Sequence, residues 1–239
     1  MKFAISRSVI LIFSLTFPFL ASADLKTDAK MNFLVALAKE GESQRFVDIV
    51  KQEQLLTRGD SDGHTALFAA MFGEPKLTDR LLALGASLEQ RDAMGYTPLI
   101  SAALLGYPEA ADSFIKKGAN IEAKNADGQT ALLMSVLSMS ANEAQVSSPD
   151  KGENKWHHRW DKVIDLLVKN GANVNTVDNR GATPLFIAIF SNNEELCRYL
   201  IGIGADPNHK LKNGVSLLRF AKVGAAKSIV KLLEENGAK

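Results

Sequence analysis

From residue 24 onward, apolar segments with helical periodicity alternate with polar segments that contain glycine. Segment 44–52 shows this periodicity well, because Phe46, Ile49 and Val50 fall on one side of a helix. Further helices that end at Asn or Gly are predicted at 77–84, 109–117, 161–170, 194–203 and 227–236. The polar segments between units, such as 89–92 and 122–125, are predicted hairpins, here called fingers. The pattern therefore predicts helical units separated by polar fingers.

A five-residue motif recurs ahead of the helices and marks the start of each unit. The copies are Gly63-His64-Thr65-Ala66-Leu67, Gly95-Tyr96-Thr97-Pro98-Leu99, Gly128-Gln129-Thr130-Ala131-Leu132, Gly181-Ala182-Thr183-Pro184-Leu185 and Gly214-Val215-Ser216-Leu217-Leu218. Their glycines are 32, 33, 53 and 33 residues apart, and 53 equals one period of 33 plus an insert of 20. A fixed period of this length indicates a stack of similar supersecondary units.

The motif resembles the ankyrin repeat, which has a Thr-Pro-Leu-His turn, an alanine-rich inner helix, an outer helix ending in Gly-Ala, and a hairpin. The segment from Gly95 through Thr97-Pro98-Leu99 to Gly118-Ala119-Asn120 matches it almost throughout. The turn histidine of the family is replaced in every copy, by Phe68, Ile100, Leu133, Phe186 and Arg219. The resemblance implies that the hydrogen bonds made by that histidine are absent here, and we expect apolar contacts in their place.

We predict an all-α repeat solenoid, an ankyrin-repeat array made of an N-terminal capping unit and five repeats. The cap takes residues 24–59, with helices expected at 31–39 and 44–52. The repeats take residues 60–91, 92–124, 125–177, 178–210 and 211–239. A solenoid needs a cap at each end, and the polar Arg219 and Lys222 on the last inner helix suit a unit whose neighbour is water.

The repeat at 125–177 carries the insert, near 139–160, between its inner and outer helices. Trp156, Trp160 and Val163 continue the apolar face of the outer helix at helical spacing, which predicts a helical hairpin rising above its neighbours. The two tryptophans either close this hairpin or contact a partner. His157 and His158 are adjacent, and consecutive residues on a helix point about 100° apart, so we predict no metal site there.

Residues 1–23 have the organisation of a signal peptide. Lys2 and Arg7 precede an apolar stretch at 9–20, and Ala21-Ser22-Ala23 follows as a small-residue cleavage site. We expect cleavage after Ala23 and a periplasmic or secreted product with no membrane insertion. Without Lys2 and Arg7, 26 basic residues face 27 acidic ones, which gives no electrostatic reason to expect a nucleic-acid partner.

The sequence offers no catalytic or cofactor-binding constellation. The histidines lie in turns or in the insert, and none has a nucleophile with an orienting group at a recognisable spacing. The glycines are accounted for by repeat turns, so no phosphate-binding loop is predicted. Cys197, the single cysteine, is expected to be a small buried residue. We therefore predict a protein that is not an enzyme and binds no cofactor.

An apolar stripe is predicted along the groove formed by the inner helices. The position seven residues after the motif Thr or Ser is apolar in every repeat: Phe72, Leu104, Leu137, Phe190 and Val223. Met94 and Tyr96 of a neighbouring finger could widen the stripe, and Arg91, Lys124 and Arg180 are further finger candidates. Contiguous exposed apolar surface marks binding sites; the alternative is that these residues pack between inner helices.

The predicted function is a non-enzymatic protein-binding scaffold of the bacterial periplasm, acting as a monomer and gripping a protein partner in its concave face. Ankyrin-repeat proteins with a cleaved signal and no other domain resemble two sorts of envelope component. One sort supports or protects a periplasmic protein, including in defence against oxidative stress. The alternative is an immunity protein that neutralises an envelope-acting toxin such as a secreted phospholipase.

Overall fold

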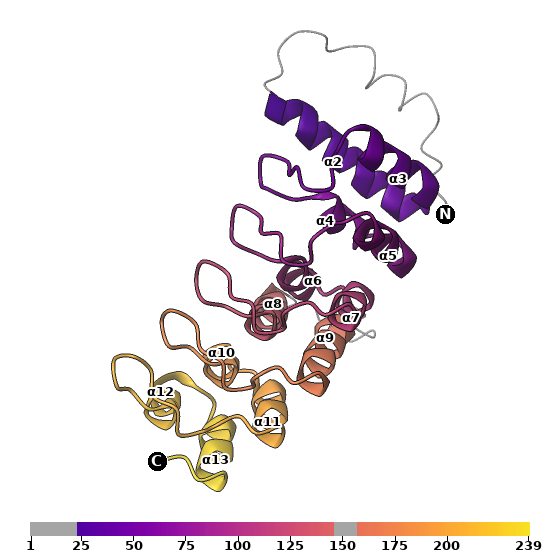
Figure 1. Ribbon diagram of the computed structural model, residues 1–239. Helices are drawn as coiled ribbons and strands as arrows, with labels where there is room; N and C mark the ends of the chain where they lie inside the picture. The colour runs from indigo at the N-terminus through magenta and orange to yellow at the C-terminus, as the bar shows by residue number, and fades with distance from the viewer. Residues whose placement is uncertain (1–22, 146–156) are drawn as a thin grey trace.

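The computed structural model describes residues 23–145 and 157–239, which form a single row of helix pairs (Figure 1). The row starts with a capping pair, α2 (Ala23–Glu40) and α3 (Ser43–Gln52). The inner helices are α4 (Ala66–Ala70), α6 (Pro98–Leu105), α8 (Ala131–Gln145), α10 (Pro184–Phe190) and α12 (Leu217–Gly224). The outer helices are α5 (Pro75–Ala83), α7 (Pro108–Lys116), α9 (His157–Lys169), α11 (Glu194–Gly202) and α13 (Lys227–Glu235).

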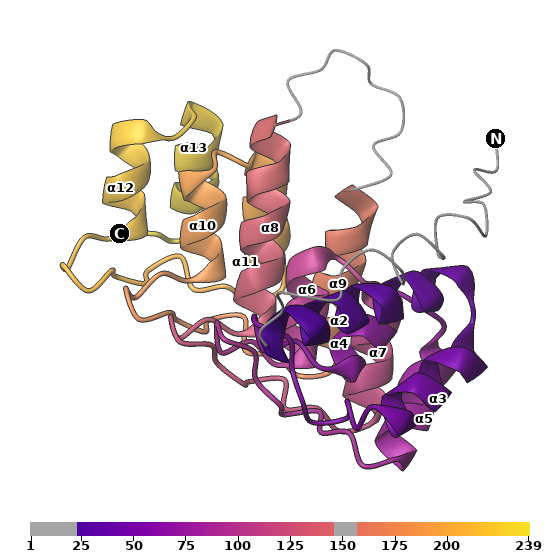
Figure 2. The same ribbon diagram turned by 90° about the horizontal axis from the view of Figure 1, so that it is seen from above.

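The fingers project from one side of the row, beside the inner helices, and the outer helices cover the other side (Figure 1). Viewed from above, the fingers run away from the helices at a steep angle to their axes (Figure 2). The described residues form helices and turns, with one isolated bridge between Lys210 and Ser216 at the last finger. We call the solvent-facing side of the fingers and inner helices the concave face.

The recurring motif starts each inner helix for local reasons. Thr97 caps α6 by accepting the N–H of Ile100 at 3.3 Å, and Thr183 caps α10 by accepting the N–H of Phe186 at 3.1 Å. Proline follows both threonines at the first helical position, where its missing N–H costs nothing. The Leu of the motif then turns into the core, with at most 1% of its surface exposed in every repeat: Leu67, Leu99, Leu132, Leu185 and Leu217.

The glycine of the motif is required by the approach of the next finger. Gly95 has φ +77°, and a Cβ there would lie 3.0 Å from the backbone nitrogen of Ala126 in the following finger. Gly63 has φ +80°, and its Cβ would lie 2.9 Å from the nitrogen of Ala93. Both positions combine a left-handed backbone with no room for a side chain, which explains why glycine recurs at this register.

Apolar contacts do replace the histidine of the family turn in four repeats. The ring of Phe68 stacks on His64 with centroids 3.9 Å apart, and Phe186 meets Phe220 edge-on at 5.0 Å. Ile100 and Leu133 are fully buried. The fifth substitute, Arg219, is exposed on the last inner helix, in agreement with its place at the end of the row.

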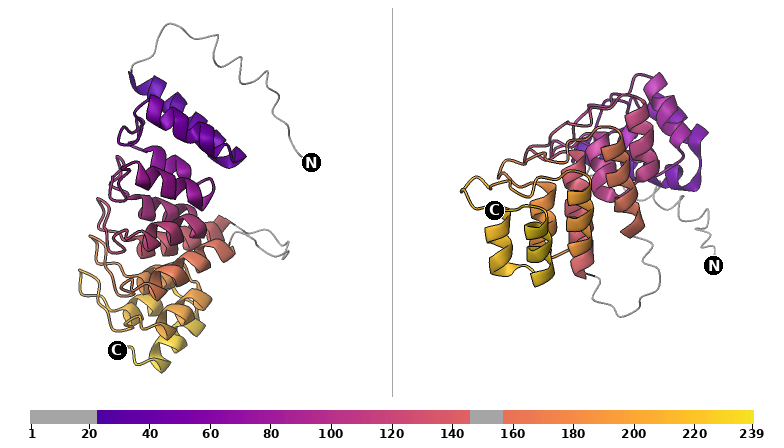
Figure 3. Two further views of the ribbon diagram at one scale, coloured as in Figure 1. Left: turned by 45° about the vertical axis from the view of Figure 1, so that its right-hand side comes forward. Right: turned by 90° about the horizontal axis from the view of Figure 1, so that it is seen from below.

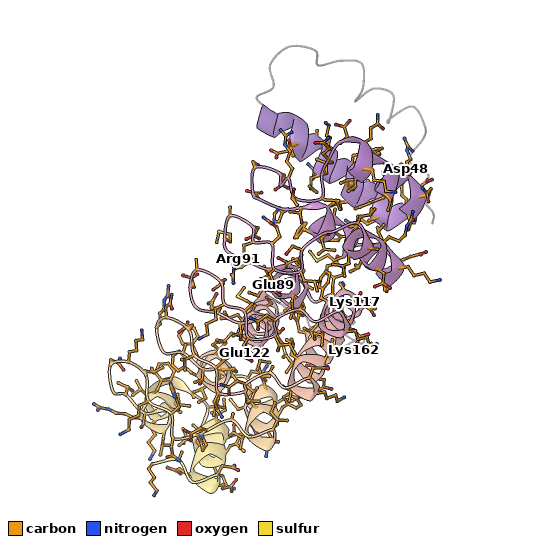
Figure 4. The ribbon with its side chains drawn as sticks, in the orientation of Figure 1. Asp48, Glu89, Arg91, Lys117, Glu122 and Lys162 are labelled. Carbon is orange, nitrogen blue, oxygen red and sulfur yellow. The ribbon has the colours of Figure 1, made fainter. Side chains whose placement is uncertain are left out.

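Adjacent repeats are also joined through their fingers. Backbone N–H groups of Ala93 and Asn179 donate to the carbonyls of Asp62 and Asp127 in the preceding fingers, at 2.7 and 2.8 Å. The carboxylate of Glu89 accepts the N–H of Asn120 at 2.9 Å, one repeat further along. Figure 4 shows Glu89 and Arg91 on the finger side of the row, opposite Lys117 and Lys162 on the outer helices.

The insert lengthens both helices of the third repeat, as the sequence predicts. The inner helix α8 has 15 residues, against 8 in α6 and 7 in α10, and the outer helix α9 has 13 against 9 in α7 and α11. In Figure 2, α8 rises past α10, and Figure 3 shows the pair extending beyond the neighbouring helices. Trp156 and the tip of the insert lie outside the described residues.

The first helix of the cap is longer than the sequence pattern indicates. It begins at Ala23 rather than at residue 31, and buries Thr27 together with Met31 and Leu34. A buried side chain therefore lies ahead of the predicted start. The outer helix of the insert-bearing repeat begins at His157, in agreement with its predicted backward extension, and Trp160 is buried in its first turns.

Candidate protein-binding face

Large apolar side chains are exposed on one side of the row. Among the described side chains, the exposed ones are Met94 (58%), Leu105 (37%), Phe190 (70%) and Val223 (87%). Met94 is at the tip of a finger, and the other three lie on the inner helices α6, α10 and α12. The outer helices carry none of them. The apolar surface therefore faces the concave side, which is the side predicted for partner binding.

The predicted stripe is covered by the protein's own side chains in its first half. Phe72 is half-buried, and its ring makes edge contacts with Phe68 at 5.6 Å and Tyr107 at 5.1 Å between centroids. The ammonium group of Lys39 lies 5.1 Å from the Phe72 centroid. Leu104 is likewise half-buried and packs on the core. For Phe72 and Leu104, the structure supports the packing alternative.

The second half of the stripe is open and aromatic. The rings of Phe186 and Phe190 in α10 and Phe220 in α12 form a cluster whose centroids are 5.0 to 6.2 Å apart. Phe190 stands out of this cluster into solvent. Val223 follows it at the equivalent position of the last repeat. We call these residues, with the half-buried Leu137, the open stripe.

A hollow of about 490 Å³ lies beside the open stripe, between the inner helices and the last two fingers. Leu137, Phe186 and Phe190 form its apolar wall. The other lining residues are Gln129, Asp178, Arg180, Ala182, Ile187, Leu211, Lys212 and Asn213. We call this feature the C-terminal groove. Its size suits one or two large side chains of a partner.

The predicted finger contacts divide into two kinds. Arg91 donates from its guanidinium to the carbonyls of Gly95 at 2.7 Å and Lys124 at 2.6 Å, and the ammonium group of Lys124 donates to Val177 at 3.0 Å. These two side chains tie successive fingers together. Arg180 differs, because its backbone N–H donates to Asp178 while its exposed guanidinium has no hydrogen bond or ion pair within the described residues. Of the three predicted finger cations, Arg180 is therefore the one available to a partner.

Tyr96 and Met94 occupy the same finger but differ in exposure. The carboxylate of Asp92 accepts the N–H groups of both residues, at 2.9 Å from Met94 and 2.8 Å from Tyr96, and so shapes the turn. Burial, followed by the charges of Asp92 and Asp127, raises the pKa of the half-buried Tyr96 hydroxyl. Met94 points outward and widens the exposed apolar surface on the finger side.

Trp160 is a packing residue. It is 8% exposed, its indole N–H donates to the carbonyl of Leu104 at 3.2 Å, and its ring lies against Gly106. This placement corrects its inclusion among partner contacts, because a residue buried between two repeats has no surface to offer. The predicted pairing with Trp156 involves a residue outside the described part of the chain.

The sequence analysis missed Phe220 and Leu211. Phe220 lies three residues before Val223, outside the register that defines the stripe, and its contact with Phe186 and Phe190 comes from the packing of α12 on α10. Leu211 occupies the register of Asp178, 33 residues earlier, where the other fingers have Asp or Asn. An apolar residue at a position that is otherwise Asp or Asn indicates, from the sequence alone, an apolar side chain on this finger.

The described residues contain no arrangement suited to catalysis or to a metal. No three His, Cys, Asp or Glu side chains among them gather closely enough to hold an ion. His64 lies between the carboxylates of Asp60 at 3.2 Å and Asp92 at 3.7 Å, where it joins two fingers. Cys197 is fully buried, and burial raises the pKa of its thiol to about 12. A protonated, inaccessible thiol is a poor nucleophile.

Comparison with known families agrees with this architecture. A family model described as ankyrin repeats (3 copies) matches residues 31–125, 68–145 and 157–210, more than half of the chain. The chain belongs to the ankyrin-repeat family. Ankyrin repeats are typical non-enzymatic scaffolds for protein–protein interaction, and an apolar concave face suits that role.

Individual ankyrin-repeat proteins resemble the chain to different extents. The crystal structure of an ankyrin repeat domain from Acinetobacter baumannii AYE has a TM-score of 0.65 and 26% identity, and the match covers 86% of this chain and 98% of that one. An ankyrin repeat protein of Borreliella burgdorferi is 31% identical over 31% of this chain and 34% of its own length. Protein phosphatase 1 regulatory subunit 27 of Homo sapiens is 44% identical over 19% of this chain and 29% of its own.

The chain thus spans about a third of the length of the curated relatives it matches. The shared part is the ankyrin repeat itself. None of the helices in the described residues has both the length and the apolar character needed to cross a membrane.

Proposed function

We propose that this protein is a non-enzymatic scaffold of the bacterial periplasm that binds one protein partner, as a monomer, through its concave face. The observation that carries the proposal is the one-sided exposure of Phe190, Val223 and Met94. A side chain that is 70% exposed, as Phe190 is, contributes little to the core of its own chain. Its apolar character is explained if another protein covers it.

The expected gain on covering this surface follows from the hydrophobic effect. Removing apolar surface from water contributes about 25 cal/mol per Å², and large aromatic residues are common among the few side chains that dominate binding energy. The cluster of Phe186, Phe190 and Phe220 holds the Phe190 ring in contact with its neighbours. A partner therefore meets a surface that is already partly ordered, which lowers the entropy cost of association.

The periplasmic location is supported by two features. Lys2 and Arg7, the apolar stretch at 9–20 and Ala21-Ser22-Ala23 have the order of a signal peptide. Cys197 is buried with a raised pKa, so it is protected from oxidation in a compartment that forms disulfides. N-terminal sequencing of exported protein should begin at Asp24-Leu25-Lys26. Membrane-embedded protein that retains Met1 would contradict the proposed location.

Affinity capture from a periplasmic extract tests the binding function. Wild-type protein, Phe190→Asp, Val223→Asp and the control Lys76→Glu, which changes an exposed residue of the outer helix α5, are used in parallel. We expect one protein to be retained by the wild type and by the control and lost with both concave-face variants. Retention that is equal on all four would show that the partner binds elsewhere.

A second candidate function is favoured by the open groove of about 490 Å³ next to exposed aromatic rings. Such a surface suits a tight inhibitory complex, as an immunity protein forms with an envelope-acting toxin such as a secreted phospholipase. The captured partner separates the two candidates. Loss of the partner's own enzymatic activity on binding indicates immunity. Retained activity with longer survival under oxidative conditions indicates protection.

A further inference from the structure

The charge of the fingers changes sign along the row. In the first finger, Arg58 is outnumbered by Asp60 and Asp62; in the last, Asp206 is outnumbered by Lys210 and Lys212. The residue before the motif glycine is acidic in the first and third fingers and basic only in the fourth: it is Asp62, Met94, Asp127, Arg180 and Asn213 from the first finger to the last. The fingers therefore carry a net negative charge at the N-terminal end of the row and a net positive charge at the C-terminal end, where the open stripe lies.

Basic side chains border the C-terminal groove. Arg180 and Lys212 line it from two successive fingers. Arg219, exposed on α12, lies outside it and lines a separate hollow with Phe220 and Val223. Lys212 is engaged, because its ammonium group donates to the carbonyl of Asn179. Arg180 and Arg219 have no carboxylate partner within the part of the chain that the structure describes.

One acidic side chain, that of Asp178, also lines the groove, and its carboxylate accepts hydrogen bonds from backbone N–H groups of its own finger. Oδ1 of Asp178 accepts the N–H of Arg180 at 2.9 Å and the N–H of Ala182 at 2.8 Å. Its charge is partly compensated by these donors. The groove is thus an apolar, aromatic-walled hollow with a rim whose available charges are positive.

We propose that the C-terminal groove binds an acidic segment of a partner protein, with a Phe, Trp, Tyr or Leu side chain inserted beside Phe190 and a carboxylate facing Arg180. This inference rests on the proposed binding function and specifies the chemistry of the partner. Guanidinium groups hold carboxylates in a two-pronged geometry that a lysine cannot provide. A hollow of about 490 Å³ accepts a large side chain, and the surrounding rings supply edge and face contacts.

The basic rim and the aromatic wall make separate contributions. Complementary charge speeds association and excludes basic competitors, while the inserted apolar side chain supplies most of the affinity. The first half of the stripe offers no open ring, because Phe72 is covered by Tyr107 and Lys39. The site is therefore confined to the last three repeats.

Selection of peptides from a random display library tests this proposal and requires no purified partner. The exported chain is used as wild type, Arg180→Glu, Phe190→Ser and the control Lys76→Glu. We expect the wild type and the control to enrich peptides in which Asp and Glu flank an aromatic residue or Leu. The Arg180→Glu protein should lose this preference for acidic residues, because the rim then repels carboxylates.

The most enriched peptide is then synthesised with a fluorescent label and its affinity is measured by anisotropy. Phe190→Ser should weaken binding at least about thirtyfold, and Arg180→Glu about tenfold, with no change for Lys76→Glu. Enrichment of neutral or basic peptides, or an affinity that Arg180→Glu leaves unchanged, would overturn the proposal. It would leave the proposed function intact, provided that binding of the captured partner still depends on Phe190.

Two other occupants of the groove would give different results. A second copy of the chain, with its acidic N-terminal fingers in the groove, would appear as a dimer in sedimentation that Arg180→Glu dissociates. Occupation by residues 1–23 would appear as peptide binding by the chain that starts at Asp24 and none by the full chain. Either result overturns the assignment of the groove to an acidic partner segment.

Discussion

The indole N–H of Trp160 donates to the backbone carbonyl of Leu104 at 3.2 Å, across the boundary between two repeats. This bond satisfies a carbonyl at the C-terminal end of α6, where helices leave such groups without an internal partner. The indole ring covers Gly106, which ends α6 with a left-handed conformation at φ +67°. The base of the insert is therefore part of the core of the array, even though the insert interrupts the repeat period.

Replacing Trp160 should destabilise the whole array. Trp160→Ala removes a buried ring and its hydrogen bond, so we expect a loss of about 3–5 kcal/mol of unfolding free energy. Trp160→Phe keeps most of the ring packing and removes the donor, with an expected loss of about 1 kcal/mol. Urea unfolding followed by circular dichroism measures both. Equal stability of Trp160→Ala and the wild type would show that the indole contact contributes nothing.

The tip of the insert should be dispensable for folding, in contrast to its base. Deleting residues 141–155 and rejoining the helices with a short Gly-Ser loop leaves Trp160, Val163 and Ile164 in place, and these make the contacts with the core. Insertions between repeat helices behave as loop-like additions. Thermal melting should therefore remain cooperative and close to that of the wild type. An unfolded deletion variant would place the tip within the core.

Arg91 should matter for stability, because its guanidinium joins two fingers through the carbonyls of Gly95 and Lys124. Arg91→Ala removes charge-assisted hydrogen bonds, each of which contributes about 1.5–3 kcal/mol before solvent exposure reduces the effect. Arg180→Ala is the matched control: its guanidinium makes no such bond within the described residues, so its stability should change by less than about 0.5 kcal/mol. Chemical unfolding of both variants gives the comparison. Equal effects would contradict the assigned roles.

Cys197 should react with a thiol reagent only when the protein unfolds. Burial, and secondarily the charge of Glu194, raises the pKa of its thiol from 9.0 to about 12, so the reactive thiolate is absent at neutral pH. A raised pKa in the folded state means that the associated stability is intact below pH 9.0 and is lost as the pH rises toward 12. Modification kinetics with and without denaturant test this. Rapid modification of the folded wild type at neutral pH would show that the thiol is accessible.

The helix pairs could be predicted from sequence because their causes are local. Thr97 and Thr183 cap inner helices through their own side chains, and Gly95 permits the finger turn through its own backbone. These residues recur at a fixed period, so that once the helices of one repeat are assigned, the helices of the other repeats follow. The predicted ends of the outer helices agree with the structure to within a residue or two for the same reason.

Exposure along the stripe could not be predicted, because it depends on neighbouring units. Phe72 and Phe190 have the same register and the same side chain, yet Phe72 is enclosed by Tyr107 and Lys39 while Phe190 is 70% exposed. Trp160 is a second example. Its spacing in the sequence indicates that it lies on the apolar face of a helix, but not that its indole N–H donates to the carbonyl of Leu104 in the preceding repeat. Periodicity identifies which positions are equivalent, and packing between repeats decides which of them remain open.

The measurement that most directly tests partner binding through the open stripe combines melting and affinity for two variants, Phe190→Asp and Leu104→Asp. Phe190 is exposed, so Phe190→Asp should melt like the wild type and bind the captured partner at least about thirtyfold more weakly. Leu104 packs on the core, so Leu104→Asp should lower the melting temperature markedly. Unchanged melting together with unchanged affinity for Phe190→Asp would contradict the proposed site.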